Sequence, residues 1–408
     1  MRVSHLSAAA LLAVSLVAIF SPVTAQSPPT VWPDEGPATW SPRPTVPAIT
    51  ADDLRTHVYQ LAADSMRGRA AGTRGNFMAT AYVASVFERL GLRPAGENGS
   101  YFQVVPADGP TQPEYPSRNV IAILPGSDPT LSGTYVLVGA HNDHVGMVEG
   151  DPFDHDALRA FNRVMRPQGA NDRPGPPSAE QRARIDSLTA YARSIRPPRA
   201  DSVMNGADDD ASGNGLLLEI AERFATAPAP KRSIIFISHA SEEGGLRGSR
   251  YFTDNPTVPL DSIVAAHNMD MVGKGRVTDV RFGGPAQVQM LGARRLSADF
   301  GDVIDSLNAV RQETMAIDYS WDRTNALNRF CRSDQVNYFR HTIPVTYFST
   351  GYSVDYHQAT DEPQYIEYDK SARLGRFIHE IMHTIAERPT RLRVLPMEER
   401  DLSAQCTR

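Results

Sequence analysis

Apolar residues recur every three or four positions in several stretches of the chain, which is the spacing of one face of an α-helix. Leu54, Val58 and Leu61 lie on one such face and predict a helix that ends near residue 64. Thr50, just before it, is a favourable N-cap residue. A second amphipathic helix is predicted over residues 78–90. The clearest apolar stripe lies near the C-terminal end and comprises Phe377, Ile378, Ile381, Met382 and Ile385.

Between the helical stretches lie short apolar runs that are bounded by Pro, Gly and Ser, which is typical of strands. A further helix is predicted to begin at Ser212, as its N-cap, and to run through Phe224. Strands that alternate with helices predict a layered α/β fold with a largely parallel sheet. The predicted strands cover residues 119–124, 135–138, 233–238, 262–267 and 344–348.

The first 25 residues have the layout of a secretory signal peptide. Arg2 and His5 precede an apolar run over residues 8–20, and Val23-Thr24-Ala25 offers a small-residue cleavage site. The run is too short to span a bilayer comfortably, and an uncleaved anchor is the alternative. We therefore expect export, to the periplasm or outside the cell, after cleavage near Ala25. No later stretch of the sequence predicts a membrane span.

Most of the remaining chain is expected to form one domain, over residues 50–390. A Pro-rich leader at 26–49, expected to be extended and poorly ordered, precedes it, and a tail at 391–408 follows. A segment at about 145–204 interrupts the domain with many Pro, Arg and Asp residues. Its Ser178-Ala179-Glu180-Gln181 sequence has capping-box spacing and predicts a helix within the insert. Such an insert is either a lid or surface decoration.

The composition narrows the classes of partner. The 408 residues carry a net charge of −6, with 22% charged and 41% hydrophobic residues, as in ordinary globular proteins. A mildly acidic chain has no electrostatic attraction for nucleic acid or an anionic membrane surface. The two cysteines, Cys331 and Cys406, either pair after export or remain free thiols. They are too few for a cysteine-rich zinc site.

Histidines and carboxylates gather where predicted strands end, and ligands of open α/β sheets bind at such ends. His141 and Asp143 follow the strand at 135–138. A histidine placed there can bind a metal, while the aspartate fixes its tautomer. The triplet Asp208-Asp209-Asp210 precedes a predicted helix. Adjacent carboxylates repel one another, so a divalent cation would stabilise them.

Three more clusters extend this pattern. Glu242 and Glu243 follow a predicted strand, and adjacent glutamates can divide labour, one binding a metal and the other taking a proton from its water. Asp270 follows the next strand, and His357 lies in a polar loop further on. Each cluster alone also fits a polar surface turn. Together they offer the mixed nitrogen and oxygen donors that zinc binds.

With these motifs the sequence resembles the co-catalytic zinc aminopeptidases, the bacterial leucyl aminopeptidase and aminopeptidase Y group. That group is related to glutamate carboxypeptidase, glutaminyl cyclase and the transferrin receptor. The resemblance spans about residues 52–387 and rests on the order and spacing of the five clusters. It includes Gly68-Arg69-Ala70-Ala71-Gly72-Thr73 and Gly245-Leu246-Arg247-Gly248-Ser249. It implies a zinc-exopeptidase fold of three layers, α/β/α, around a mixed, largely parallel sheet.

The resemblance also implies a role for each cluster residue. Asp208 would bridge two zinc ions, through a cis peptide bond to Asp209, and Glu242 would be the general base that activates a metal-bound water. His144 is not a family zinc ligand. The implied ligands of the two zinc ions are His141 and Asp270 for one, Glu243 and His357 for the other, and Asp208 for both. The residues implied to support these ligands are Asp143, Asp209 and Asp361.

The implied activity is that of a secreted exopeptidase that removes N-terminal residues from peptides or small proteins. A glutamate-type carboxypeptidase is the alternative, and it would need Arg or Lys side chains to hold a substrate carboxylate. A glutaminyl cyclase and a non-catalytic binding ectodomain are weaker alternatives, because every ligand position and Glu242 are present. The sequences Ser333-Asp334-Gln335 and Ser353-Val354 depart from the family pattern and leave the substrate preference open.

Overall fold

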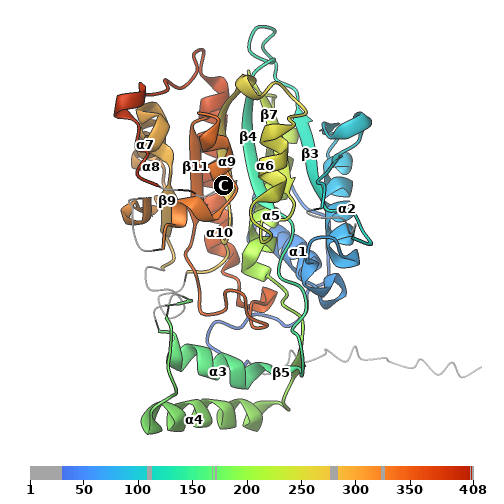
Figure 1. Cartoon of the computed structure of the whole chain (residues 1–408), viewed down its shortest axis with the longest axis vertical. Coiled ribbons are helices and arrows are strands. Elements are labelled where there is room, and N and C mark those ends of the chain that lie inside the picture. Colours follow the sequence, from blue (N-terminus) through green and yellow to red (C-terminus); the bar gives the residue numbers. More distant parts are fainter. Residues whose placement is uncertain are drawn as a thin grey trace, which may run out of the picture.

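A mixed sheet of nine strands forms the centre of the described part of the chain (Figure 1). The computed structural model describes residues 30–107, 113–167, 169–170, 172–275, 284–322, 327–404 and 406. The predicted signal peptide lies outside these ranges. The strands are β1 (Arg93–Pro94), β2 (Phe102–Val104), β3 (Arg118–Leu124), β4 (Tyr135–His141), β7 (Ser233–His239), β8 (Ile263–Met269), β9 (Gln287–Leu291), β10 (Ala316–Asp318) and β11 (Val345–Ser349).

The sheet has the order β1-β3-β7-β4-β8-β11-β9-β10, with β2 beside β3. Strand β4 pairs in parallel with both β7 and β8, and β8 pairs in parallel with β11. Strand β3 is antiparallel to β7, and β9 is antiparallel to β11. The carboxyl ends of the four central strands therefore meet at one edge of the sheet. The predicted mixed, largely parallel sheet is confirmed.

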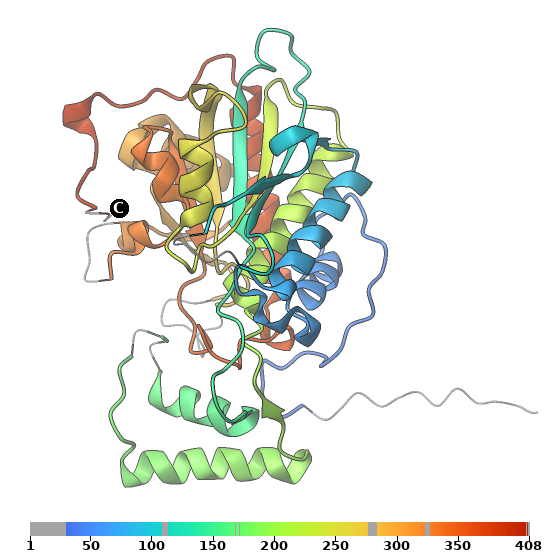
Figure 2. The ribbon, with the colours of Figure 1, turned by 45° about the vertical axis from the view of Figure 1, so that its right-hand side comes forward.

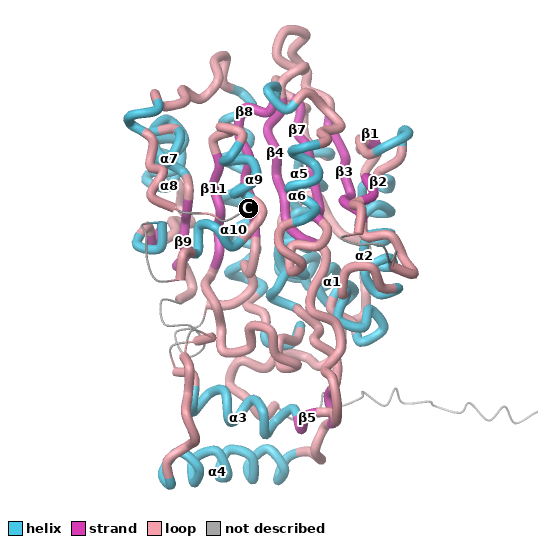
Figure 3. The backbone as a smooth tube through the Cα atoms, in the orientation of Figure 1, coloured by secondary structure: helices cyan, strands magenta, loops and turns pink. Residues whose placement is uncertain are grey.

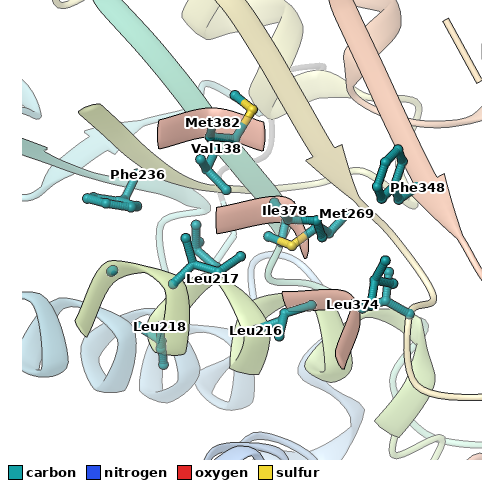
Figure 4. Packing of buried hydrophobic residues seen from close by; sticks show 14 of the residues in the cluster. Val138, Leu216, Leu217, Leu218, Phe236, Met269, Phe348, Leu374, Ile378 and Met382 are labelled. Atoms are coloured by element: carbon teal, nitrogen blue, oxygen red, sulfur yellow. The ribbon is translucent and has the colours of Figure 1, made fainter. Parts of the chain in front are cut away.

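Helices cover both faces of the sheet (Figure 3) and complete the predicted three layers. One layer contains α1 (Ala51–Leu61), α2 (Arg74–Arg89), α5 (Gly213–Ala225), α8 (Ala298–Val310) and α10 (Tyr368–Glu387), and the other contains α6 (Arg247–Asp254) and α9 (Gln335–Arg340). The short helix α7 (Ala293–Leu296) precedes α8. Leu217 of α5 and the predicted stripe of α10 pack against Val138, Phe236 and Met269 of the sheet (Figure 4). This apolar core fixes the sheet edge on which the polar loops lie.

The predicted insert forms a pair of helices, α3 (His155–Met165) and α4 (Ala179–Ile195), which lie side by side beyond the end of the sheet (Figure 2). The capping box of Ser178 and Gln181 at the start of α4 is confirmed. The short strands β5 (Phe153–Asp154) and β6 (Ala200–Asp201) pair at the base of the insert. Arg159 of α3 is fully buried and pairs with Asp355 of the main domain at 2.9 Å. A buried ion pair therefore anchors the insert to the main domain.

The leader is better ordered than predicted, over residues 30–49. Trp32 is buried, and its indole Nε1 donates a hydrogen bond to Asp156 Oδ1 of the insert at 2.9 Å. Asp34 is also buried and accepts a hydrogen bond from Arg159. These contacts hold the segment against the insert, although it has no regular secondary structure.

Two local expectations are settled by side-chain contacts. Helix α5 begins where predicted, but its cap is Asp210, whose Oδ1 accepts from the Gly213 amide at 3.0 Å. The Ser212 hydroxyl instead donates to the carbonyl of Asp208. Cys331 and Cys406 form a disulfide, which holds the C-terminal tail to the domain. Within the described ranges, no helix combines the length and apolar character needed to cross a membrane.

Candidate metal centre

The five polar clusters come together at the carboxyl edge of the central strands. His141 is the last residue of β4, and the Glu242–Glu243 pair follows β7. Asp270 comes directly after β8, and His357 lies in the loop after β11. The acidic triplet occupies the turn that leads into α5. Each group is therefore held by a buried strand or helix at a fixed position.

Asp209 lies between two histidines from different strands. Its Oδ1 is 3.1 Å from His141 Nε2, and its Oδ2 is 3.1 Å from His357 Nε2. The carboxylate is 3% exposed. Burial alone would raise the pKa of Asp209, but the two nearby histidines lower this pKa well below its usual range. A carboxylate with one oxygen toward each histidine has the geometry of a ligand shared by two metal ions.

This arrangement corrects the assignment of Asp208 as the bridging residue. Asp208 Oδ1 accepts a hydrogen bond from the Gly273 amide at 2.7 Å, and no histidine of the described residues lies within ion-pair distance of its carboxylate. The cis peptide bond joins Asp209 to Asp210, one position later than expected. Asp209, assigned only a supporting role from the sequence, is thus the aspartate of the triplet that lies between the two histidines.

On one side of Asp209, His357 and Glu243 form the first donor group together with His144. Glu243 Oε2 is 3.1 Å from His357 Nε2, and Glu243 Oε1 is 3.0 Å from His144 Nδ1. His144 Nδ1 is also 3.7 Å from Asp209 Oδ2. The donor atoms of these four residues lie within 4.8 Å of one another. His144 was not expected among the ligands, and its place in an His-Asn-Asp-His run was the available signal.

On the other side, His141 and Asp270 form the second donor group. Asp270 Oδ1 is 3.7 Å from His141 Nε2. Asp210 also lies within this group. Its carboxylate accepts the backbone amides of His141, Gly213 and Met271 at 3.0–3.2 Å. Asp210 is therefore committed to holding the loops together, and Asp209 is the better third donor.

Two aspartates were predicted to support the metal ligands. Their carboxylates accept hydrogen bonds from backbone amides instead of from histidine rings. Asp143 accepts the amides of Glu242 and Glu243 at 2.9 and 3.3 Å, and its Oδ1 is 3.7 Å from His141 Nδ1. Asp361 accepts the amide of Asp209 at 3.2 Å, and that of the preceding residue. These contacts fix the positions of the donor loops.

Arg69 stabilises the turn that precedes Asp209. The fully buried guanidinium donates to the carbonyls of Leu61, Asn205 and Gly206 at 2.6–2.9 Å. A planar fork with five donors can bind several carbonyls at once. Gly206 has a φ of +56°, and a Cβ there would lie 2.2 Å from the carbonyl oxygen of Asp209. Only glycine fits this turn without displacing the carboxylate that follows.

Glu242 lies beside both donor groups but is not part of either. Its residue is 9% exposed. Burial and the negative charges of Asp270 and Glu243 raise the pKa of Glu242 well above its usual range, although His141 opposes the shift. A further buried carboxyl of this region is Asp334, in the Ser333-Asp334-Gln335 sequence, to which no role was assigned from the sequence. Burial raises the pKa of Asp334 to about 7.

The donor set fits a pair of divalent ions such as zinc. Both ring nitrogens of His141, Nε2 of His144 and Oδ1 of Asp270 are buried without a hydrogen-bond partner among the described residues. Buried polar atoms are normally paired, so the unpaired His141 Nε2 and Asp270 Oδ1, which lie 3.7 Å apart, indicate a ligand between them. No Lys or Arg side chain of the described residues lies within ion-pair distance of Asp209, Glu243 or Asp270. Imidazole and carboxylate together suit zinc.

Comparison with known proteins finds a family match within the chain. Residues 182–382 match the model of peptidase family M28. The chain carries a peptidase family M28 domain. The matched region includes Asp209, Glu243 and His357, whereas His141 and His144 lie before it. The family resemblance predicted from the sequence is confirmed.

Curated relatives and solved structures agree with this placement. A probable zinc metalloprotease of Pyrenophora tritici-repentis is 39% identical over 74 residues, which are 18% of this chain and 17% of that protein. The chain thus spans less than a fifth of the length of the curated relatives that it matches. The zinc aminopeptidase BSAP of Bacillus subtilis superposes with a TM-score of 0.54 at 14% identity, over 83% of this chain and 96% of BSAP. The LapA aminopeptidase of Legionella pneumophila gives 0.53 at 16% identity, over 83% and 73% of the two chains. At these identities the likeness establishes the fold.

A pocket of about 220 Å³ opens beside His357 in the M28 domain. Three arginines line it: Arg166 and Arg173 from the loop after α3, and Arg332 from a short 3₁₀ turn at Arg329–Arg332. The sequence could not predict this pocket, because Arg166 and Arg173 lie more than 150 residues before Arg332.

A third buried group of the M28 domain contains His155, Asp201 and Glu362. His155 Nδ1 is 3.1 Å from Asp201 Oδ2, and His155 Nε2 is 3.0 Å from the Tyr365 hydroxyl. Arg199 donates to Glu362 at 2.7 Å. Both ring nitrogens are thus occupied and a guanidinium neutralises the carboxylates, so this group joins the insert to the domain and does not fit a metal.

Proposed function

We propose that this protein is a secreted zinc-dependent exopeptidase that removes residues from the N-terminus of peptides. The observation that carries the proposal is the position of Asp209, with one carboxylate oxygen 3.1 Å from each of His141 Nε2 and His357 Nε2. Glu242, a carboxyl outside both donor groups, lies next to this bridge. A shared carboxylate and an adjacent free acid are the two elements that metal-assisted hydrolysis requires.

The two groups of donors have separate assignments in the proposal. His141 and Asp270 would hold one ion, His357 and Glu243 the other, and Asp209 both. Zinc bound there would supply Lewis acidity, which polarises a scissile carbonyl and lowers the pKa of water.

Glu242 would act as general base and then as general acid. Its raised pKa suits a group that takes a proton from the attacking water and passes it to the leaving amine. Asp143 accepts the amide of Glu242 at 2.9 Å and so keeps the carboxyl at one position. Burial keeps bulk water from exchanging protons with it.

Restriction to chain ends follows from the charge of the site. A free substrate α-amine is cationic and would be attracted to the carboxylates around Asp209 and Glu243, whereas an internal peptide nitrogen carries no such charge. Export belongs to the same proposal. The Cys331–Cys406 disulfide supports it, because disulfides persist in oxidising compartments.

A carboxypeptidase is the second candidate, and the arginine-lined pocket beside His357 favours it. Guanidinium groups bind carboxylates in a fork-like geometry, and the sequence-based alternative needed such groups. The same pocket can also accept an acidic side chain, so it does not exclude the aminopeptidase.

The deciding experiment combines metal content with substrate choice. The purified chain would be analysed for zinc and assayed on aminoacyl-anilides and on dipeptides with free or amidated C-termini. We expect about two zinc ions per chain, hydrolysis that depends on a free α-amine, and loss of activity with a chelator. Glu242→Gln should retain the zinc and lose hydrolysis.

Other results would change the assignment. Hydrolysis that requires a free C-terminus instead would favour the carboxypeptidase. An absence of bound zinc together with an absence of hydrolysis would rule out both peptidase functions.

A further inference from the structure

The pocket beside His357 concentrates positive charge next to the proposed metal centre. Its walls include three arginines and two tyrosines, and no carboxylate is among its described lining residues. The ring of Tyr356 stacks on His357 with centroids 3.9 Å apart, and Tyr352 stacks on Tyr356 at 4.8 Å. Because His357 itself lines the pocket, a group bound there lies next to this candidate metal donor.

The three arginines lack carboxylate partners. No described acidic side chain lies within 4 Å of the guanidinium of Arg166, Arg173 or Arg332, and Nε of Arg166 is buried without a hydrogen-bond partner. Two other arginines of the insert do have such partners, Arg159 with Asp355 and Arg196 with Asp156. Unpaired like charges at one pocket repel one another, so an anion that binds there relieves the repulsion.

Neighbouring contacts hold two of these arginines in place. Arg332 donates to the Tyr356 hydroxyl at 3.3 Å, and its guanidinium lies 4.6 Å from the centre of the Tyr352 ring. Arg173 donates to the Ala170 carbonyl at 2.9 Å. The loop that carries Arg173 is itself docked, because the Ala170 amide donates to the Tyr352 carbonyl at 3.2 Å. The charges are thus positioned before any ligand binds.

We propose that Arg166, Arg173 and Arg332 form a specificity pocket for a carboxylate of the substrate. This proposal rests on the proposed peptidase function and adds the substrate class. The carboxylate has two sources in a peptide, an acidic side chain next to the scissile bond or a free C-terminus of a short peptide. Both present the planar pair of oxygens that a guanidinium fork binds. The insert, which supplies two of the three arginines, is then a determinant of specificity.

The test compares substrates that differ only in this charge. The first pair is glutamyl-p-nitroanilide and glutaminyl-p-nitroanilide, which differ at the side chain. The second pair is Leu-Ala and Leu-Ala-amide, which differ at the C-terminus. We expect the carboxylate member of one pair to be favoured about tenfold in kcat/KM, a modest factor because Arg173 and Arg332 are exposed to solvent. The pair that shows the preference identifies the source of the carboxylate.

Substitutions of the pocket arginines distinguish the contribution of the pocket from that of the reaction centre. The double variant Arg166→Gln, Arg332→Gln should lose the preference through a higher KM for the carboxylate substrate, with kcat and zinc content retained. Arg332→Lys should retain part of the preference for the carboxylate substrate, because lysine keeps the positive charge but lacks the planar guanidinium group. Arg184→Gln is the matched control, because Arg184 is an exposed arginine of the same insert outside the pocket.

A binding measurement tests the preference for a carboxylate without depending on catalytic turnover. Calorimetry on the zinc-loaded Glu242→Gln variant would compare Leu-Ala with Leu-Ala-amide, and glutamate with glutamine. Tighter binding of a carboxylate member, lost in the double arginine variant, supports the pocket. Equal rates and equal affinities within both pairs, or a preference that survives the double variant, would overturn it. Hydrolysis without any charge preference would refute the pocket alone, whereas zinc-loaded protein that hydrolyses nothing would refute the proposed function.

Discussion

The metal-donor cluster (His141, His144, Asp209, Glu243, Asp270 and His357) and the insert cluster (His155, Asp201 and Glu362) are built from the same kinds of buried side chain, yet their surroundings differ. In the insert cluster both nitrogens of His155 have partners, at 3.1 Å and 3.0 Å, and Arg199 neutralises Glu362. In the metal-donor cluster, both ring nitrogens of His141 and Nε2 of His144 lack hydrogen bonds within the described ranges. No Arg or Lys side chain of the described residues lies within ion-pair distance of its carboxylates Asp209, Glu243 and Asp270.

This difference shows that the type of donor does not by itself make a metal site. A buried carboxylate next to an arginine is already compensated, and a cation would have to displace that pairing. A set of carboxylates without arginine or lysine partners leaves its charge for a metal. The comparison predicts that the metal-donor cluster governs zinc content and hydrolysis, whereas the insert cluster governs stability.

The largest expected effect comes from substitution of the bridging residue. Asp209→Asn keeps the size of the side chain but removes the charge that faces both His141 and His357. We expect zinc content to fall and kcat/KM to drop by about 10³-fold or more, since several kcal/mol of charge stabilisation are lost. Elemental analysis and steady-state kinetics would measure the two effects.

Asp208→Asn is the matched control for this prediction. Its carboxylate accepts the Gly273 amide and lies within ion-pair distance of neither histidine, so zinc should be retained and kcat/KM should fall far less. A larger loss in Asp208→Asn than in Asp209→Asn would reverse the assignment and restore the residue expected from the sequence.

The acidic triplet shows which features of the site can be predicted from the sequence and which cannot. Strand-end motifs placed His141, Glu243, Asp270 and His357 correctly at one sheet edge, because parallel strands align their carboxyl ends. Three adjacent aspartates, however, share one local pattern, and only the backbone path through the turn decides which carboxylate points inward. The cap of α5 was misassigned for the same reason, because Asp210 rather than Ser212 turns back to the helix.

The arginine pocket and the insert cluster could not be predicted at all from local sequence. Arg166 lies in the insert and Arg332 lies in a distant turn, and nothing between them sets a spacing. Likewise, residues 30–49 have a composition typical of disorder, but burial of Trp32 against the insert orders them. Long-range packing decides these features.

A large stability effect without an effect on metal content is expected at Arg159. Its buried guanidinium pairs with Asp355 and Asp34 and lies 3.5 Å from the centre of the Tyr365 ring. Arg159→Met leaves two buried carboxylates without this partner, which costs about 3–5 kcal/mol of unfolding free energy. Urea unfolding would measure the loss, and elemental analysis should still find the wild-type zinc content at low denaturant.

The control for Arg159 is an exposed pair of the same insert. Arg193 contacts Asp154 at 2.8 Å, but half of the Arg193 side chain is exposed. Because solvent screens such pairs, Arg193→Met should change stability much less. Equal losses in the two variants would mean that burial is not what makes the Arg159 contacts important.

The smallest of the three effects, and the most direct test of the comparison, is expected at His155. His155→Gln removes at least one of the hydrogen bonds to Asp201 and Tyr365 and leaves a buried acceptor poorly satisfied, at a cost of about 1–3 kcal/mol. Arg199 still neutralises the carboxylates, so the zinc content should not change. If His155→Gln lost one zinc ion per chain with little change in unfolding free energy, the insert cluster would be a metal site, and pairing with arginine would not be what separates the two clusters.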